Sequence, residues 1–318
     1  MQHFIFYKKH KPFVGIPVSS VKVSFSAIEC VPNYTAIRKV FKLYMYLKVG
    51  LSYVFSLNGQ RVGGVLKKWF MDQRENDKLN PVFIWSLVAG RERYYIHILD
   101  KNGNKKQFVK ITTKACDYHL LENEKNKLEY YSKAKTFRTP TVYGFNKNNN
   151  YCSLSVSYID DNYRLFHPES NIFPEKISNE ISKDMKMLSI GELRNKQWSR
   201  NSVRFNNLLQ SVGNNYLVKV STVHGDFGSE NIFLNSETND FMIIDWENST
   251  DNSPFLTDKV AYWLGANYRL LKNNDSLAYN SFCRDFGKFK KIDIDLALLF
   301  LTNAKFDLAY LIVKKWQN

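Results

Sequence analysis

Cysteine is scarce in this sequence. Among 318 residues there are four cysteines, and no two of them show C-x-x-C spacing or the Cys/His spacing of a metal-ligand set: Cys30, Cys116, Cys152 and Cys283. This scatter argues against a zinc site and is typical of a protein in a reducing compartment.

A long, uncharged apolar run is also missing. The longest apolar segment, residues 296–313, contains Asn303, Lys305 and Asp307, and charges in mid-span are costly in a bilayer. This segment therefore predicts a core helix and not a membrane span. The first nine residues lack a basic stretch followed by an apolar one, so no signal peptide is expected. Together these absences predict a cytoplasmic protein.

Acidic residues are few in the first half of the chain. Residues 1–150 contain 26 Lys and Arg against 10 Asp and Glu, a net charge of +16, whereas residues 151–318 contain 19 against 20, a net charge of −1. A one-sided basic surface can dock on an anionic membrane or an acidic glycan, and a surface that only aids solubility is the alternative. Nucleic acid is not expected as a partner, because no helix-turn-helix, zinc-finger or RNP-like signature is present.

The basic half includes a predicted helix at residues 35–55. Its apolar residues share one face and its basic residues lie elsewhere: Ile37, Phe41, Tyr44, Leu47 and Leu51, then Arg38, Lys39, Lys42 and Lys48. Such a helix either packs on its own domain or lies at a membrane interface, so peripheral contact with the inner face of an anionic membrane stays open. The alternation of residues 21–28 predicts a strand, and residues 72–78 predict a polar linker.

The most informative segment is H-G-D-F-G-S-E-N at residues 224–231, followed by I-I-D-W-E at residues 243–247. Phosphoryl transfer from ATP requires a carboxylate that takes or orients the proton of the attacking hydroxyl. It also requires an amide and a second carboxylate that hold Mg²⁺ on the phosphates. Asp226, Asn231 and Asp245 occur in that order.

The segment between the two motifs predicts a hairpin. Residues 231–234 and 241–244 are short apolar runs, and residues 236–240 have turn chemistry. Such a hairpin would bring Asn231 and Asp245 to one metal pair. The alternative is a surface hairpin whose polar residues only form turns.

These two motifs resemble those of the aminoglycoside phosphotransferase and choline kinase group, the small-molecule branch of the protein-kinase-like fold. That group usually has H-G-D or H-N-D where regulated protein kinases have H-R-D, and I-D-W or I-D-F/Y where they have D-F-G. The resemblance implies ATP and Mg²⁺ as cofactors, Asp226 as the catalytic residue, and Asn231 and Asp245 as metal ligands. It also implies an α+β, bilobal fold with a small antiparallel-sheet N-lobe and a mainly helical C-lobe.

The resemblance extends over residues 81–260 and predicts three parts of the chain. Residues 1–80 form an N-terminal basic extension, residues 81–158 the N-lobe with the ATP-binding sheet and helix, and residues 159–318 the C-lobe with the catalytic loop, metal site and acceptor site. Within the C-lobe, residues 175–214 carry long helical patterns.

A lysine and a glutamate complete the predicted ATP site. A lysine inside a short apolar strand needs a partner, and Lys110 in the strand 107–111 fits the lysine that contacts the α- and β-phosphates. The alternative is an edge-strand lysine that reaches water. Helical spacing places Glu124 on the core side of the next helix as the expected partner, and Glu122 is the competitor.

The remaining site residues are implied by the resemblance alone. The loop between the strands predicted at 82–86 and 94–99 would lie over the ATP phosphates. Strands predicted at 139–145 and 152–159 lead to the hinge between the lobes, where adenine would meet the backbone of Ser157 and Tyr158. Asp258 would brace the catalytic loop from the start of a helix, and His224 is interpreted as a scaffold of that loop.

The sequence thus predicts a kinase, an ATP- and Mg-dependent phosphotransferase that phosphorylates a hydroxyl group of a small molecule, a glycan or a lipid-linked sugar. Because the first half is basic, a neutral or anionic acceptor is favoured over a cationic aminoglycoside. No activation segment ending in A-P-E follows Asp245, so activity without regulatory phosphorylation is expected. Two alternatives stay open: a protein kinase, and a non-catalytic protein of kinase ancestry that docks on an anionic surface.

Overall fold

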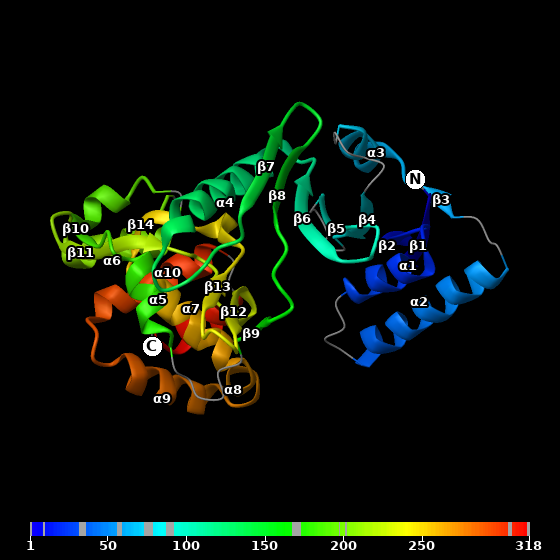
Figure 1. Cartoon of the computed structure of the whole chain (residues 1–318). Helices are drawn as coiled ribbons and strands as arrows, with labels where there is room; N and C mark the ends of the chain where they lie inside the picture. Colours follow the sequence, from blue (N-terminus) through cyan, green and yellow to red (C-terminus); the bar gives the residue numbers. More distant parts are fainter. Residues whose placement is uncertain are drawn as a thin grey trace. The chain divides into compact units, whose positions relative to one another are not determined.

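The computed structural model describes residues 2–8, 10–31, 36–55, 59–72, 79–86, 92–166, 173–196, 198–200, 202–304 and 307–316. The chain forms two compact units, drawn in Figure 1. The first unit comprises Met1–Glu129 and Pro140–Ile159, and the second comprises Tyr130–Thr139 and Asp160–Asn318.

An antiparallel sheet of eight strands forms the centre of the first unit, with the spatial order β3-β1-β2-β4-β5-β6-β8-β7. Its strands are β1 (Gln2–Lys8), β2 (Lys11–Pro17), β3 (Gln60–Arg61), β4 (Asn80–Trp85), β5 (Arg93–Leu99), β6 (Lys105–Thr112), β7 (Val142–Lys147) and β8 (Cys152–Ser157). The strands β1 to β3 come from the predicted N-terminal extension, yet they continue the same sheet as the predicted N-lobe because β2 pairs with β4.

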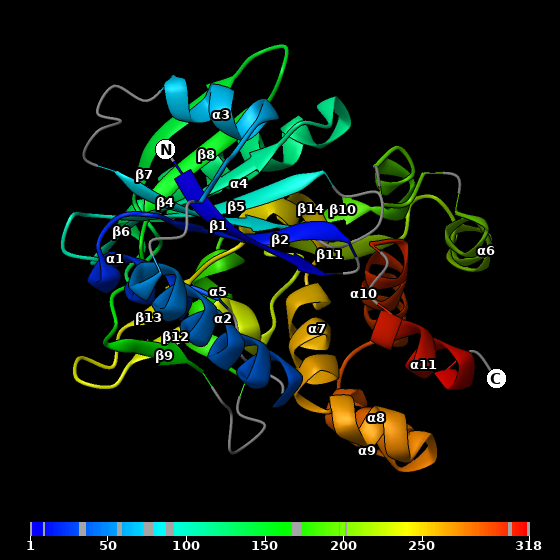
Figure 2. The same cartoon turned by 90° about the vertical axis from the view of Figure 1, so that its right-hand side faces the viewer.

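Helices cover both faces of this sheet. On one face, α1 (Val21–Glu29) and α2 (Ala36–Val54) share a core with Val82. On the other, α3 (Gly64–Met71) shares a core with Phe83. Neighbouring strand residues point to opposite faces, which is why these two residues belong to different cores. Figure 2 shows α3 on one side of the sheet and the α1/α2 pair on the other.

The strand expected at residues 21–28 is wrong, because this segment forms α1. The Ser20 side chain caps the helix by accepting a hydrogen bond from the Val23 N–H at 3.2 Å, which satisfies one N–H of the first turn. The buried residues Val23, Ala27 and Ile28 recur at helical spacing. An alternating pattern over so few residues is compatible with the two-residue period of a strand and with the 3.6-residue period of a helix. The N-cap at Ser20 favours the helix.

The second unit is mainly helical and contains two three-stranded antiparallel sheets, ordered β10-β11-β14 and β13-β12-β9. Its strands are β9 (Tyr163–Leu165), β10 (Lys186–Ser189), β11 (Leu217–Val223), β12 (Ile232–Asn235), β13 (Phe241–Ile243) and β14 (Thr250–Pro254). Its helices are α5 (Glu175–Ile181), α6 (Val203–Val212), α7 (Thr257–Ala266), α8 (Tyr268–Asn273), α9 (Asp275–Phe286), α10 (Lys291–Asn303) and α11 (Asp307–Trp316). The α+β class predicted from the sequence is confirmed.

Two further expectations in this unit need correction. The helical pattern predicted through residues 185–188 is interrupted, because Lys186–Ser189 forms β10 and pairs with β11. The apolar segment 296–313 is not one helix but parts of α10 and α11, and the former contributes most of its residues to the core. None of the helices in the described ranges has the length and apolar character needed to cross a membrane.

Candidate active site

Asp226 lies in the loop that follows β11 and precedes a 3-10 turn, Ser229–Asn231. The Asn231 side chain is buried and donates from Nδ2 to the main-chain oxygen of Asp226 at 2.8 Å and to its Oδ2 at 3.3 Å. These bonds fix the orientation of both side chains. They also make Oδ1 the atom that the Asn231 amide offers to a cation.

The predicted hairpin is formed by β12 and β13, which pair antiparallel with Ile232 opposite Ile243. Its open end holds both candidate metal ligands, because the Ile244 N–H donates to the Asn231 carbonyl at 3.1 Å and Asp245 follows directly. Asp245 has a left-handed backbone, with φ 65° and ψ 51°. Non-glycine residues held in this conformation cluster at active sites.

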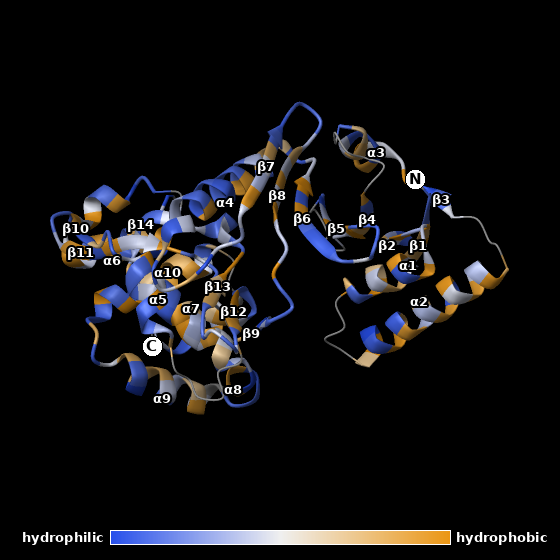
Figure 3. Ribbon diagram, viewed as in Figure 1, coloured by the Kyte–Doolittle hydropathy of each residue, from blue (hydrophilic) through white to orange (hydrophobic). Residues whose placement is uncertain are grey.

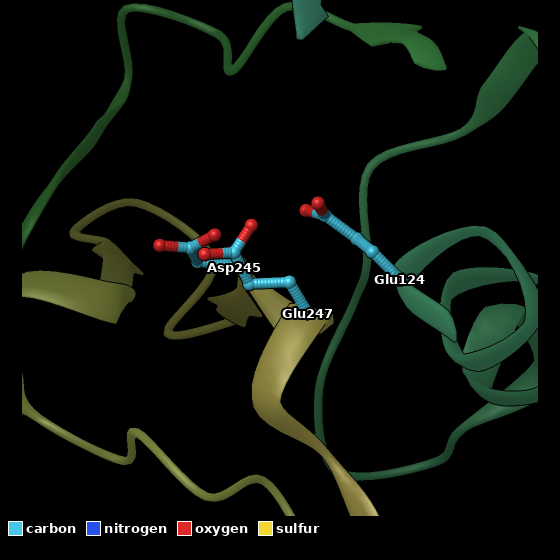
Figure 4. A group of neighbouring side chains, drawn as sticks. All are labelled: Glu124, Asp245 and Glu247. Carbon is cyan, nitrogen blue, oxygen red and sulfur yellow. The ribbon is translucent and has the colours of Figure 1, made fainter. Parts of the chain in front are cut away.

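Glu247 is a site residue that sequence reasoning missed. It is buried, and its carboxylate lies within 4.8 Å of that of Asp245. Figure 4 shows these two side chains next to each other on the segment after β13, and its third labelled side chain, Glu124, belongs to α4 (Tyr118–Tyr130) of the first unit. Glu247 is the last residue of the I-I-D-W-E motif, so the sequence contains it. Its burial, which the structure shows, is what identifies it as a site residue.

The carboxylates of this loop repel one another. Burial, the charge of Asp245 and the charge of Glu230 raise the pKa of Asp226 to about 6, although the hydrogen bond from Asn231 opposes the shift. A divalent cation relieves such repulsion, and Mg²⁺ prefers oxygen ligands of this kind. The donor set of Asn231 and the neighbouring carboxylates therefore fits Mg²⁺.

A glycine is sterically required in the loop that carries Asp226. Gly225 has φ 84°, and a Cβ placed on it would lie 2.3 Å from the carbonyl oxygen of Asn248. An L-residue at this position would suffer both an unfavourable backbone conformation and a collision. The sequence shows only that arginine is absent here, and the structure gives the reason.

Asp258 and His224 hold the same loop in place. The buried Asp258 carboxylate accepts hydrogen bonds from the backbone N–H groups of His224 at 2.7 Å and Gly225 at 3.0 Å. The His224 ring donates from Nε2 to the Ile244 carbonyl at 2.9 Å, and its Nδ1 accepts from the Asp226 N–H at 3.4 Å. Both ring nitrogens thus have partners inside the protein, which supports the scaffold role predicted for His224.

In the first unit, Lys110 and Glu124 form a buried ion pair. The Lys110 Nζ lies 2.8 Å from each carboxylate oxygen of Glu124, and the side chains are 11% and 5% exposed. The competitor Glu122 instead pairs with Lys147 at 2.9 Å on the surface. The strand β6 and the helix α4 therefore place the expected lysine and glutamate together.

The predicted hinge residues already use their backbone N–H groups. That of Ser157 donates to the Thr141 carbonyl at 2.8 Å, and that of Tyr158 donates to the Lys106 carbonyl at 3.3 Å. An adenine that bonded to these N–H groups would have to displace both partners. The loop expected over the phosphates and the polar linker lie, at residues 87–91 and 73–78, outside the described residues.

Aromatic rings line the sheet face that carries Lys110, a feature that sequence reasoning missed. Phe108 shares this face because it lies two residues earlier in β6. Its ring centroid is 5.1 Å from that of His97, which is 5.6 Å from that of Tyr158. The Lys105 ammonium lies over the Tyr158 ring at 5.1 Å. Planar groups of this kind can stack on an aromatic ligand.

No protein-family model matches the chain, and no curated protein matches its sequence. Among solved structures it is similar to aminoglycoside phosphotransferase APH(3'')-Id from Streptomyces rimosus, with 14% identity and a TM-score of 0.43 over 76% of this chain and 98% of that one. It is also similar to a GDP complex of aminoglycoside 2'-phosphotransferase-IIIa, with 13% identity and a TM-score of 0.44 over 80% and 98%. A GDP and kanamycin complex of APH(2'')-IIIa shows 12% identity and a TM-score of 0.42 over 74% and 91%.

Proposed function

We propose that this chain is a kinase that transfers a phosphoryl group from ATP, with Mg²⁺, to a hydroxyl group of a small molecule or glycan. The observation that carries the proposal is a set of polar side chains in the second unit, in which Asp226 and Asp245 are half-buried and Asn231 and Glu247 are buried. Asp226 is held by Asn231, has a pKa that burial and then the neighbouring carboxylates raise, and precedes a hairpin whose open end presents Asp245. Oxygen ligands for the cation and a carboxylate that orients the acceptor are the parts that phosphoryl transfer requires, and strained backbone residues such as Asp245 cluster at active sites.

Each residue of this set has a proposed role. Bound Mg²⁺ would neutralise charge on the transferring phosphoryl group. Asn231 and Asp245 would hold it, and the nearby charge of Glu247 would strengthen the attraction of the site for the cation. Asp226 would accept a hydrogen bond from the acceptor hydroxyl and orient its oxygen for in-line attack.

The first unit would bind the nucleotide. Lys110, fixed by Glu124, would contact the α- and β-phosphates. The adenine would lie against Ser157 and Tyr158, with the rings of His97 and Phe108 as stacking partners. Because both hinge N–H groups have protein partners, we propose that stacking contributes more to base binding here than backbone hydrogen bonds do.

The acceptor is proposed to be neutral or anionic. The basic excess lies in residues 1–150, at +16 against −1 for the remainder, and such a field disfavours a polycationic aminoglycoside. A sugar of a glycan or of a lipid-linked precursor fits this charge better, in a cytoplasmic setting. Phosphorylation of aminoglycosides but of no sugar would contradict this preference.

The test is ATP consumption with Mg²⁺ across sugars, amino alcohols, aminoglycosides, anionic glycolipids and model proteins. Asp226→Asn should lower turnover by about 10²–10⁴-fold while Mg·ATP still binds in a calorimeter. Asp240→Asn, the same change at the far end of the β12/β13 hairpin, is the matched control and should keep activity. A protein kinase would show transfer to the proteins alone.

Two results would overturn the proposal. One is unchanged turnover in Asp226→Asn. The other is an absence of Mg·ATP binding to the wild-type chain, which would favour a non-catalytic protein of kinase ancestry.

A further inference from the structure

The helix α2 carries a continuous apolar stripe on its exposed side. Its members, including Phe55 directly after the helix, are between 49% and 82% exposed: Ile37, Val40, Leu43, Tyr44, Leu47, Leu51, Val54 and Phe55. At 3.6 residues per turn they fall within a sector of about 120°. Figure 3 shows apolar residues recurring along the length of α2. Contiguous exposed apolar surface of this kind marks an interaction site.

The opposite side of α2 fixes this orientation. Met45 and Val49 are fully buried against the sheet and α1. The Lys42 ammonium donates to the Glu29 carboxylate, and the Tyr53 hydroxyl lies 2.8 Å from Ser24 Oγ. A rotation that buried the stripe would break these contacts. The contacts of α2 within the first unit therefore hold the apolar side chains of the stripe on the exposed side of the helix.

Basic residues border the stripe and acidic residues are absent from α2. On a helical projection, the exposed Lys39 lies about 40° beyond one edge of the stripe and the exposed Lys48 about 20° beyond the other. The surrounding residues 1–72 contain 11 Lys and Arg against Glu29 and Asp72 as acidic residues. The stripe thus lies in a basic field that repels a second copy of the same surface and attracts an anionic one.

We infer that α2 docks the protein on an anionic lipid bilayer, with the stripe in the headgroup and acyl boundary and the flanking lysines at the phosphates. A helix with one apolar face and a basic border binds a bilayer in this in-plane geometry. Leucine, isoleucine and valine supply buried apolar area, while Tyr44 and Phe55 add aromatic contacts at the interface. The inference goes beyond the proposed phosphotransfer and does not depend on it, because docking requires neither nucleotide nor acceptor.

The experiment is flotation of the full chain with vesicles of phosphatidylcholine alone, or of equal parts phosphatidylcholine and phosphatidylglycerol. Wild type should float with the anionic vesicles only, and added salt should release it. Leu47→Gln with Leu51→Gln should weaken partition about tenfold per leucine, because each loses its buried apolar area. Lys39→Gln with Lys48→Gln should weaken it about fivefold per lysine.

The matched control is Leu217→Gln with Leu277→Gln in the second unit. These leucines are 55% and 53% exposed, against 60% and 54% for Leu47 and Leu51, so the control makes the same chemical change elsewhere and should float like wild type. Glutamine is a good helix former, so α2 should keep its fold, which circular dichroism would verify.

Three outcomes would overturn the inference. Wild type that stays unbound to anionic vesicles is the first. Equal flotation of wild type and the Leu47/Leu51 variant is the second, because α2 would then not be the docking surface. The third is a dimer in light scattering that the Leu47/Leu51 changes dissociate, without any vesicle binding, which would assign the stripe to a second copy of the chain.

Discussion

Gly225 lets the backbone of the Asp226 loop approach the segment that carries the candidate metal ligand Asp245. Its positive φ is needed for the loop to turn, and the missing Cβ lets the Asn248 carbonyl approach. Gly213 offers a comparison, because it has nearly the same φ, 82° against 84°, with no neighbouring atom within 4 Å of the position of a Cβ. Comparing Gly213 with Gly225 therefore separates the cost of backbone strain from the cost of a steric collision.

Alanine at the two positions should therefore have unequal effects. Gly213→Ala should cost about 1–3 kcal/mol in the free energy of unfolding, because it adds only the strain of a backbone conformation, φ 82° and ψ 154°, that residues other than glycine rarely adopt. Gly225→Ala should cost clearly more, because the loop must also move away from Asn248, and it should lower turnover by displacing Asp226. Urea unfolding and activity of both variants would measure this. Equal costs would show that the loop adjusts freely.

The site residues that sequence alone could suggest are those with local spacing. Asp226, Asn231 and Asp245 lie within 20 positions of one another in two motifs, so chain order and turn chemistry are sufficient to propose them. Glu247 and His97 could not be found in this way. Their significance depends on burial and on neighbours that only the folded sheet and hairpin provide.

At the scale of elements, the strands and helices with strong patterns were predictable and the short ones were not. The strands β4 to β6, the helix α4 and the hairpin β12/β13 follow from apolar runs and turn residues. The sequence predicted a strand where α1 forms and a helix where β10 forms, because a few apolar residues are compatible with the period of a strand and with that of a helix. The N-cap at Ser20 stabilises α1 as a helix, and pairing with β11 stabilises β10 as a strand.

The ion pair between Lys110 of β6 and Glu124 of α4 allows a test that separates a structural role of the pair from a role in binding phosphate. Replacing Lys110 alone by Met leaves a buried carboxylate without its cation and should cost about 3–5 kcal/mol. Adding Glu124→Leu removes that carboxylate and should recover most of the loss, which a double-mutant cycle with urea unfolding would measure. Turnover should stay lost in the double variant, because Lys110 is proposed to contact the phosphates. Recovery of activity together with stability would show that the pair is structural only.

At the scale of the molecule, the two units carry buried groups that respond to acid in opposite directions. In the first unit, burial lowers the pKa of His3 to about 4, and burial with the charge of Lys105 lowers the pKa of His97 to about 3. In the second, burial first and neighbouring charges next raise the pKa of Asp226 to about 6. Burial likewise raises the pKa of Asp258.

The signs follow from proton uptake. Below a pH of about 6.5 the unfolded chain protonates both histidines while the folded first unit does not, so that unit loses stability as the pH falls. Asp226 behaves in the opposite way, because its folded pKa lies above its unfolded value. Its contribution is complete below a pH of about 4 and is lost as the pH rises through about 6. Acid should therefore weaken the first unit and strengthen the second.

We expect this reversal in native-state hydrogen exchange of the full chain at pH values of about 7 and 5 in metal-free buffer. At the lower pH the amides of β1, β4 and β5 should lose protection by about 2 kcal/mol for each histidine, and those around β11 and α7 should gain about 1 kcal/mol from Asp226. His3→Gln with His97→Gln should abolish the loss in the first unit, because glutamine takes up no proton. A uniform loss across both units would show instead that the chain opens as one cooperative body, whose stability is set by the sum of these charges.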